Sequence, residues 1–263
     1  MKKFLFLSVL ACIIVACSSV MITGRKQLLL VPDTEVLALS AQSYSEFIAS
    51  APLSKNTTNT ALIKKVGKNI STAVETYLRT NGMAAEIANY AWEFSLVQSD
   101  EVNAFCMPGG KVVFYEGILP LTKTEAGIAV VMGHEIAHAV AKHSSEQISQ
   151  QMVLQYGAAI TDALTTNKSE IVRGSINTLY GIGAQVGVTL PFSRTHEYEA
   201  DRLGLIFMAM AGYDPSEAVG FWERMAAANA SAPLELLSTH PSDNNRIAKI
   251  KELLPEAMQY YKK

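Results

Sequence analysis

His134-Glu135-Ile136-Ala137-His138, residues 134–138, places two imidazoles and one carboxylate within a short stretch of chain. A helix turns about 100° per residue, so positions four apart lie only about 40° apart round its axis. Both imidazoles would therefore leave the same face, aligned as two ligands of a tetrahedral zinc site. Glu135 lies one step round, where it can act as a general base but is poorly placed as a third ligand. The pattern predicts a zinc hydrolase site on a helix.

The sequence on either side of this stretch favours a buried helix. Residues 122–125 (Thr-Lys-Thr-Glu) match a capping box, which predicts a helix that begins near Lys123. The apolar run from Ala126 to Met132 follows, so the polar groups of the motif would need partners, and a metal ion would supply one. The alternatives are a chance match or two histidines on a solvated face. His143 would lie about 180° round the helix from His134, so we expect it to be solvated and to bind no metal.

A third zinc ligand is expected from a second helical segment that carries Glu197, Glu199 and Asp201. Such sites use three protein ligands and leave the fourth position to water. On a helix, Glu197 and Asp201 share one face, whereas Glu199 lies about 200° from Glu197. One carboxylate of the pair could bind the metal while the other accepts the free N–H of a ligating histidine. The alternative is an acidic helix face paired with Arg194 and Arg202.

Taken together, these motifs resemble the gluzincin metallopeptidases of family 48, which include HtpX-like, Oma-type and CAAX-prenyl-protease-like enzymes. Residues 103–105 (Asn-Ala-Phe) before 108–110 (Pro-Gly-Gly), and residues 239–241 (Thr-His-Pro) before Arg246, match the same family. The resemblance extends from about residue 31 to residue 254 and implies an α+β, mostly helical zincin-type domain. It also implies one Zn²⁺ per chain, with Glu197 as the third ligand.

Residues 103–115 read as a β-hairpin whose turn is Gly109-Gly110. Metallopeptidases of this type hold a polypeptide substrate as an added strand along a sheet edge, through main-chain hydrogen bonds. By resemblance to the family, Asn103 and Ala104 are the candidate substrate-binding residues at that edge. The alternative is an ordinary core hairpin. Cys106 in the same strand is expected to be a buried small residue rather than a nucleophile.

His240 has three alternative roles. Pro241 restrains the preceding residue toward extended geometry, so His240 can project from a loop and donate to the oxyanion of the transition state as a catalytic residue. The family resemblance also allows it to occupy the open zinc position and hold the resting enzyme silent. The third alternative is a histidine that caps or packs at the start of the last helix.

The N-terminal residues predict export and a lipid anchor. Lys2-Lys3, the apolar residues 4–16 and Cys17-Ser18-Ser19 match a lipoprotein signal peptide over residues 1–16, with Cys17 as the lipid attachment site. Cleavage before Cys12 would leave a hydrophobic stub, which disfavours it. Residues 17–30 would be anchor and linker, and residues 31–263 a single domain. Ser18 favours the outer membrane, by resemblance to known lipoprotein sorting, so the domain would face the periplasm of the cell envelope.

Composition fits an exported enzyme that binds no nucleic acid, because 22 Lys and Arg face 24 Asp and Glu. Residues 33–50 and 59–80 are expected to form an N-terminal helical layer, and residues 151–190 could form a mobile lid or a plain helical hairpin. We therefore expect a lipid-anchored zinc endopeptidase that acts on misfolded or unassembled envelope proteins, as the family resemblance suggests. The alternative is a chaperone or assembly factor for outer-membrane proteins, working with their assembly machinery, whose protease site is silent or secondary.

Overall fold

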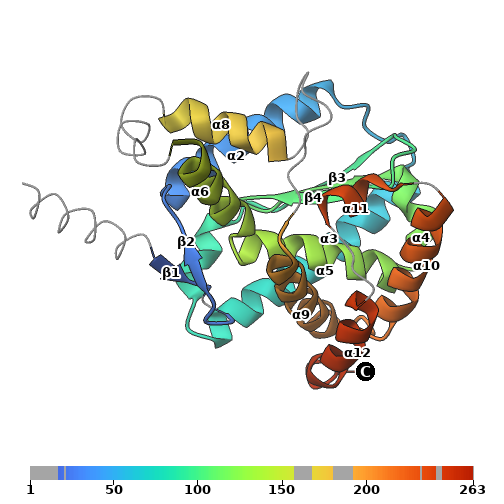
Figure 1. Cartoon of the computed structure of the whole chain (residues 1–263). Coiled ribbons are helices and arrows are strands. Elements are labelled where there is room, and N and C mark those ends of the chain that lie inside the picture. The colour runs from blue at the N-terminus through green and yellow to red at the C-terminus, as the bar shows by residue number, and fades with distance from the viewer. Residues whose placement is uncertain are drawn as a thin grey trace, which may run out of the picture.

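The computed structural model describes residues 17–20, 22–156, 168–179, 192–231, 233–240 and 245–262. These residues form a mostly helical chain with one three-stranded and one two-stranded sheet, which confirms the predicted α+β class (Figure 1). The predicted signal peptide, residues 1–16, lies outside the described residues. Within the described part of the chain, none of the helices has the length and apolar character needed to cross a membrane.

The centre of the fold is the pair of helices α5 (Glu125–Val140) and α9 (Arg194–Met210). Gly133 and Gly204 meet where the two helices touch, and a Cβ on Gly133 would lie 2.7 Å from the carbonyl oxygen of Gly204. This close approach depends on the absence of both side chains, because real Cβ atoms do not come so near to backbone. It brings the two predicted ligand-bearing helices into direct contact.

The beginning of α5 differs from the predicted capping box. Thr124 is the N-cap, and its hydroxyl accepts a hydrogen bond from the Gly127 N–H at 3.0 Å. Thr122 instead ends a short preceding helix, α4 (Leu119–Thr122), and Lys123 turns the chain with a φ of 60°. Glu125 is then the first residue of α5 rather than the third. The predicted cap is wrong by two residues. Thr122 and Thr124 are separated by one residue, and the residue type alone makes them equally good N-caps.

The three-stranded sheet has the order β3-β5-β4. Strands β4 (Ala104–Met107) and β5 (Lys111–Tyr115) are antiparallel, and β3 (Glu93–Val97) runs parallel to β5. This confirms the predicted hairpin, whose turn residues Gly109 and Gly110 have φ values of 90° and 81° that favour glycine. Because β5 is central, β4 forms one edge of the sheet, and it packs against α5.

Successive side chains of each strand point to opposite faces of the sheet, so the buried apolar residues form two clusters, one on each face. The first contains Ala104, Cys106 and the apolar faces of α3 (Thr57–Thr80), α5 and α9. The second contains Phe105, Met107 and residues of α2 (Asp33–Ser50), α6 (His143–Tyr156) and α8 (Lys168–Leu179). The helices α2 and α3 form as predicted, but they lie on opposite faces of the sheet, so the prediction that they make one N-terminal layer is wrong.

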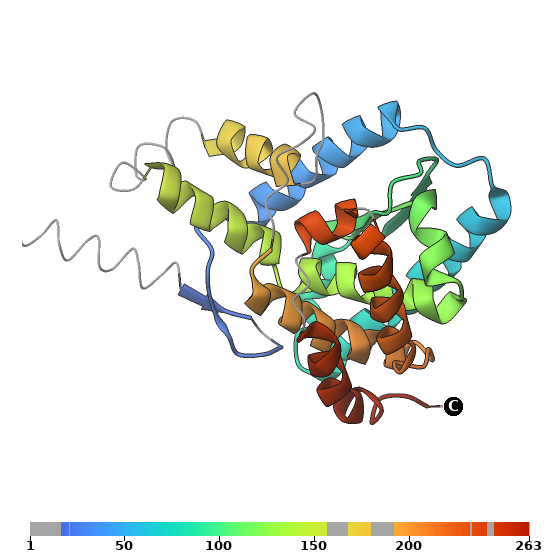
Figure 2. The same ribbon diagram turned by 45° about the vertical axis from the view of Figure 1, so that its right-hand side comes forward.

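The C-terminal helices pack around the α5–α9 pair (Figure 2). They are α10 (Glu217–Ser231), α11 (Glu235–Thr239) and α12 (Arg246–Ala257). Gly212 follows the end of α9 with a φ of 87°, a left-handed conformation that favours glycine. Short 3₁₀ turns, η1 (Ala84–Asn89) and η2 (Glu116–Ile118), flank the sheet strands.

Of the predicted lid, residues 151–156 complete α6 and residues 168–179 form α8, which packs against α2 (Figures 1 and 2). Arg173 of α8 pairs with Glu46 of α2 at 2.8 Å. Residues 157–167 and 180–191 lie outside the described residues. A closing motion of this segment stays a prediction.

Residues predicted as anchor and linker form a hairpin that lies on the domain. Its strands β1 (Cys17–Ser19) and β2 (Lys26–Leu28) are antiparallel. Val20 in its turn is part of the larger apolar cluster, and Gln27 is buried. The predicted boundary at residue 31 stays a prediction, but the residues before it contribute to the packed interior.

Candidate metal centre

Four buried side chains converge at the α5–α9 contact: His134, His138, Glu197 and His240. One ligand atom from each lies within 4.8 Å of the others. The two histidines leave the same face of α5, as the four-residue spacing predicts, and Glu197 comes from the first turn of α9. His240 follows α11 directly and is only 2% exposed.

The distances between these atoms fit a tetrahedral metal ion. Two zinc ligands at about 2.0–2.1 Å and a tetrahedral angle lie roughly 3.3 Å apart. The Nε2 atoms of His134 and His138 are 3.1 Å apart. Glu197 Oε2 lies 3.5 Å from His134 Nε2, and Glu197 Oε1 lies 3.4 Å from His138 Nε2. The donor set and its spacing therefore fit one zinc ion, although the ligand assignments stay a prediction.

His240 occupies the fourth corner of this arrangement. Its Nδ1 lies 3.3 Å from His134 Nε2 and 3.0 Å from Glu197 Oε1. Its backbone N–H donates to the carbonyl oxygen of Leu236 at 2.9 Å, which fixes the residue at the end of α11. The side chain thus lies in the ligand cluster and not at the start of the last helix.

Glu135 is buried beside the cluster, with Oε1 3.6 Å from His240 Nε2. That oxygen makes no hydrogen bond within the described residues. Burial raises the pKa of Glu135, although the neighbouring His240 and His134 lower it. A carboxylate with a raised pKa and a free oxygen is suited to accept and return a proton.

Burial also sets the protonation of the ligand cluster. It lowers the pKa of His138 well below its usual value, which favours the neutral imidazole that a metal requires. Burial lowers the pKa of His134 as well, but Asp201 and Glu197 outweigh it and raise the pKa to about 9. A metal ion that binds at His134 must therefore displace a proton.

We call the residues behind the first histidine the Arg246 support: Asp201 and Arg246. His134 Nδ1 lies 3.0 Å from Asp201 Oδ1, so Nε2 is left for the cluster. Arg246 donates two hydrogen bonds to the Asp201 carboxylate, at 2.9 and 2.8 Å, and its Nη1 lies 3.0 Å from Glu197 Oε2. Its guanidinium stacks over the Trp222 ring at 3.4 Å. The structure thus places Asp201 beside His134 Nδ1, and its role in orienting that histidine stays a prediction.

We call the residues behind the second histidine the Arg25 support: His143, Glu199 and Arg25. His143 Nδ1 lies 2.9 Å from His138 Nδ1, and His143 Nε2 lies 2.9 Å from Glu199 Oε2. Arg25 Nε donates to the same carboxylate at 2.7 Å. Burial lowers the pKa of His143 to about 4, so this imidazole is neutral near pH 7.

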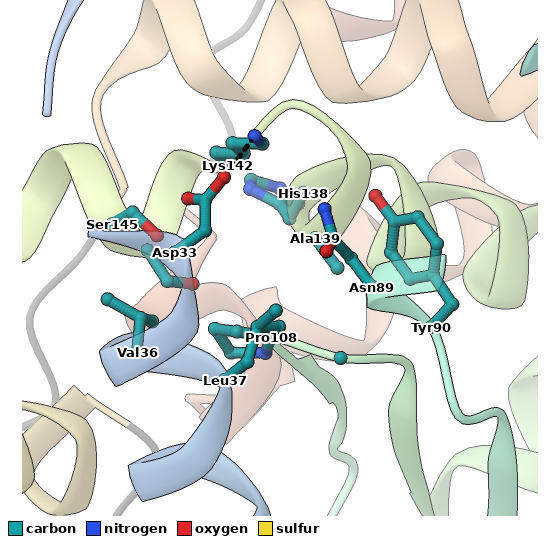
Figure 3. Close-up of a pocket in the computed structure, with 12 residues that line it drawn as sticks. Asp33, Val36, Leu37, Asn89, Tyr90, Pro108, His138, Ala139, Lys142 and Ser145 are labelled. Carbon is teal, nitrogen blue, oxygen red and sulfur yellow. Dashed lines mark hydrogen bonds and ion pairs between the residues drawn. The ribbon is translucent and has the colours of Figure 1, made fainter. Parts of the chain in front are cut away.

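The expectation that His143 is solvated is therefore wrong. It assumed that α5 continues, but α5 ends at Val140, and Lys142 reverses the chain with a φ of 58°. The helix α6 then begins at His143 and turns its imidazole back toward His138. Figure 3 shows Lys142 beside His138, paired with Asp33 of α2. The ion pair stabilises the tight turn that makes this return possible.

Two further residues that the sequence analysis did not identify complete this region. His196 stacks on His143, with ring centroids 4.4 Å apart, and its Nε2 lies 3.0 Å from Glu146 Oε2. Glu146 also accepts two hydrogen bonds from Arg25, at 2.7 and 3.0 Å. Arg25 therefore donates hydrogen bonds to both Glu146 and Glu199. Glu199 contacts His143, and Glu146 contacts the His196 ring that stacks on it.

The predicted substrate-binding residues lie at the sheet edge beside α5. Ala104 opens β4 and pairs with Phe114 of β5, and the carbonyl of Asn103 accepts from the Tyr115 N–H at 3.1 Å. The Asn103 side chain accepts from the Ala104 N–H at 2.9 Å. The thiol of Cys106 is buried with a raised pKa, which agrees with its expected role as a small core residue.

A sequence model of peptidase family M48 matches residues 65–254, a span that contains all four cluster residues. The chain belongs to peptidase family M48. This confirms the resemblance to the family 48 metallopeptidases and, with the cluster described above, the expectation of a zinc cofactor.

Similar proteins include two kinds of M48 relative. The mitochondrial metalloendopeptidase OMA1 of Schizosaccharomyces pombe is 38% identical over 190 residues, covering 72% of this chain and 53% of the relative. The human metalloendopeptidase OMA1 is 29% identical, covering 90% of this chain and 46% of the relative. The beta-barrel assembly-enhancing protease of Escherichia coli is 30% identical, covering 65% of this chain and 37% of the relative. The chain spans about half, or less, of the length of these relatives.

Proposed function

We propose that this M48 chain is a zinc endopeptidase whose metal is bound by His134, His138 and Glu197. The observation that supports it most strongly is the spacing of the ligand atoms, 3.1 to 3.5 Å, which matches the edge of a zinc tetrahedron. When bound, zinc acidifies water and polarises the scissile carbonyl.

The residues of the chain supply the proton transfers. Glu135 takes a proton from the attacking water and later passes it to the leaving amine, so the peptide bond is exchanged for a carboxylic acid and an amine. Its raised pKa, and an Oε1 atom that makes no hydrogen bond within the described residues, support this role. The Asp201 carboxylate holds the His134 Nδ1 proton, which keeps His134 Nε2 directed at the metal. Asn103 and Ala104 are proposed to bind the substrate backbone at the sheet edge beside α5.

The test is Glu135→Gln in the full-length protein. We expect the variant to keep one zinc per chain and to lose peptide cleavage by about 10²–10⁴-fold, the usual contribution of a general acid–base group. Glu252→Gln on the exposed face of α12 is the matched control. Full cleavage by Glu135→Gln would contradict the proposal. If cleavage is lost but the cellular role survives, the protein acts as a chaperone or assembly factor instead.

The metal ligands are tested by zinc content. Glu197→Ala should lose zinc, because it removes a direct ligand, whereas Glu199→Ala should bind zinc more weakly but still reach one zinc per chain at excess metal. The reverse pattern, full zinc in Glu197→Ala and none in Glu199→Ala, would refute the assignment.

His240 is proposed to hold the resting enzyme silent. Its Nδ1 occupies the corner that water needs, within 3.3 Å of His134 Nε2, so the position favours a latch over a permanent oxyanion donor. His240→Ala should then raise basal peptide cleavage at confirmed zinc content. A fall of about 10²–10³-fold would instead assign the donor role, and unchanged kinetics would exclude both.

The location in the cell is also part of the proposal. The residues before β1 match a lipoprotein signal, so we propose that Cys17 carries the lipid that anchors the protein to the outer membrane, facing the periplasm. The substrates would be misfolded or unassembled envelope proteins, an inference supported by the name of the beta-barrel assembly-enhancing protease. Metabolic labelling with a fatty-acid probe tests the anchor, and label retained by Cys17→Ala would contradict it.

A further inference from the structure

The hairpin of residues 17–20 and 22–28 is joined to the metal centre by a continuous series of polar contacts. The turn is closed by two backbone hydrogen bonds of 2.7 Å, from Val20 to Arg25 and from Gly24 to Val20. Val20 is 2% exposed and packs into the main core, so the turn is fixed to the domain. Thr23 and Arg25 are thereby directed at Glu199, and both donate hydrogen bonds to its carboxylate.

The hydrogen-bond partners assign one consistent set of protons along this series. His138 Nε2 faces the cluster, so the proton of the neutral imidazole lies on Nδ1 and is donated to His143 Nδ1. His143 must then accept at Nδ1 and donate from Nε2 to Glu199 Oε2. Glu199 is ionised and accepts from Arg25 and Thr23. Each group thus orients the next one, and the last in the series is a predicted metal ligand.

We propose that Arg25 is a positioning residue for the metal centre, acting through Glu199 and His143 to hold His138 in its ligating orientation. Glu146 and Glu199 both accept hydrogen bonds from Arg25, so this one arginine contacts both carboxylates. The inference rests on the proposed metal site. It extends that site to residues that precede the family match at residue 65 and that lie just after the proposed lipid attachment at Cys17.

The experiment measures zinc affinity of the full-length chain in detergent, by competition with a chromogenic chelator. Arg25→Gln should weaken zinc binding by about 10-fold, at the lower end of the 10–100-fold range for groups behind a ligand, because two groups intervene. The matched control is Arg202→Gln, which breaks another bidentate pair, with Glu256 at 2.9 and 2.7 Å. The control should keep the zinc affinity of the wild type.

A double-mutant cycle separates positioning from general stability. His143→Gln should weaken zinc binding by itself, and adding Arg25→Gln should then cause no further loss, because the connection is already broken. A merely structural arginine would lower the melting temperature equally in both backgrounds without changing zinc affinity. An Arg25→Gln variant with wild-type affinity, or with the same loss in the His143→Gln background, would overturn the proposal.

If Arg25→Gln does not fold, Thr23→Val takes its place, since it removes one hydrogen bond to Glu199 and keeps the shape of the side chain. It should weaken zinc binding in the same direction, and wild-type affinity would overturn the proposal. Zinc content of the wild type is measured first. A wild type without zinc would refute the proposed function itself, whereas a zinc-binding wild type with an insensitive Arg25 would refute this inference alone.

Discussion

His134 and His138 of α5 are each contacted at Nδ1, the ring nitrogen away from the ligand cluster, but by different parts of the molecule. In the Arg246 support, one carboxylate links His134 to an arginine that is 1% exposed and comes from α12. In the Arg25 support, His143 and Glu199 link His138 to an arginine whose side chain is 21% exposed and comes from the N-terminal hairpin. Arg246 is fully buried, so its loss should mainly lower the folding stability. Arg25 is partly exposed, so its loss should mainly change the metal site.

The largest expected effect is that of Arg246→Met on folding stability. The change leaves the carboxylates of Asp201 and Glu197 buried without their cation, which costs about 3–5 kcal/mol. Urea unfolding of the metal-free protein measures it. Arg25→Met should cost clearly less, because Arg25 is partly exposed and Glu146 and Glu199 keep their histidine partners. Equal losses in the two variants would remove the distinction between the supports.

Next in size is the effect of the two carboxylates on zinc affinity. Asp201→Asn weakens the orientation of His134 directly, so a loss of about 10–100-fold is expected. Glu199→Gln acts through His143 and should lose less. Chelator competition on both variants ranks them, and a larger loss in Glu199→Gln would reverse the proposed order of the supports.

The carboxylates that contact Arg25 should also make the folding stability sensitive to acid. Burial opposes ionisation of Glu146, but hydrogen bonds from His196 and Arg25 lower its pKa to about 2. Because this folded-state pKa lies below the unfolded value, the stability it adds is complete above pH about 5 and is lost as the pH falls toward about 2.

Glu146→Gln should therefore flatten the decline in unfolding free energy between these pH values. Denaturant unfolding of the metal-free protein over that range measures the slope. Glu252→Gln, an exposed carboxylate paired with Lys249, should leave it unchanged. An unaltered slope in Glu146→Gln would argue against the importance of this group.

The smallest effect concerns α5, the helix that carries both histidines. Thr124→Ala removes the N-cap hydrogen bond of α5 and should cost about 1 kcal/mol of stability. Zinc affinity should not change, because the cap lies more than two turns from His134. A marked loss of zinc affinity would show that the supports do not by themselves fix the histidines.

The parts of the site that sequence could predict are those set by helical periodicity. Four-residue spacing puts His134 with His138 and Glu197 with Asp201, whereas the choice of Glu197 as the ligand came from the family resemblance. The hairpin follows from its glycine turn and alternating strands. The structure brings these residues together as that spacing indicates.

The parts that sequence could not predict depend on where the chain reverses. The sequence of residues 140–143 does not indicate that Lys142 takes a left-handed conformation. That conformation decides whether His143 faces water or His138. Arg25 is separated from Glu199 by 174 positions, so no local pattern connects them. Glu146, Glu199 and His196 are visible in the sequence as ionisable residues, and such groups need partners when they are buried. The sequence does not show which of them pair.

The contact between Gly133 and Gly204 limits how this protein can be redesigned. In an ordinary helix, replacing glycine by alanine gains about 1 kcal/mol of stability, and protein engineers use the change routinely. Here a single methyl on Gly204 would approach the backbone nitrogen of His134 to 2.8 Å. The helices would have to separate, and the carboxylate on one would move away from the imidazoles on the other. Variants selected for heat resistance should therefore keep both glycines, although neither touches the metal.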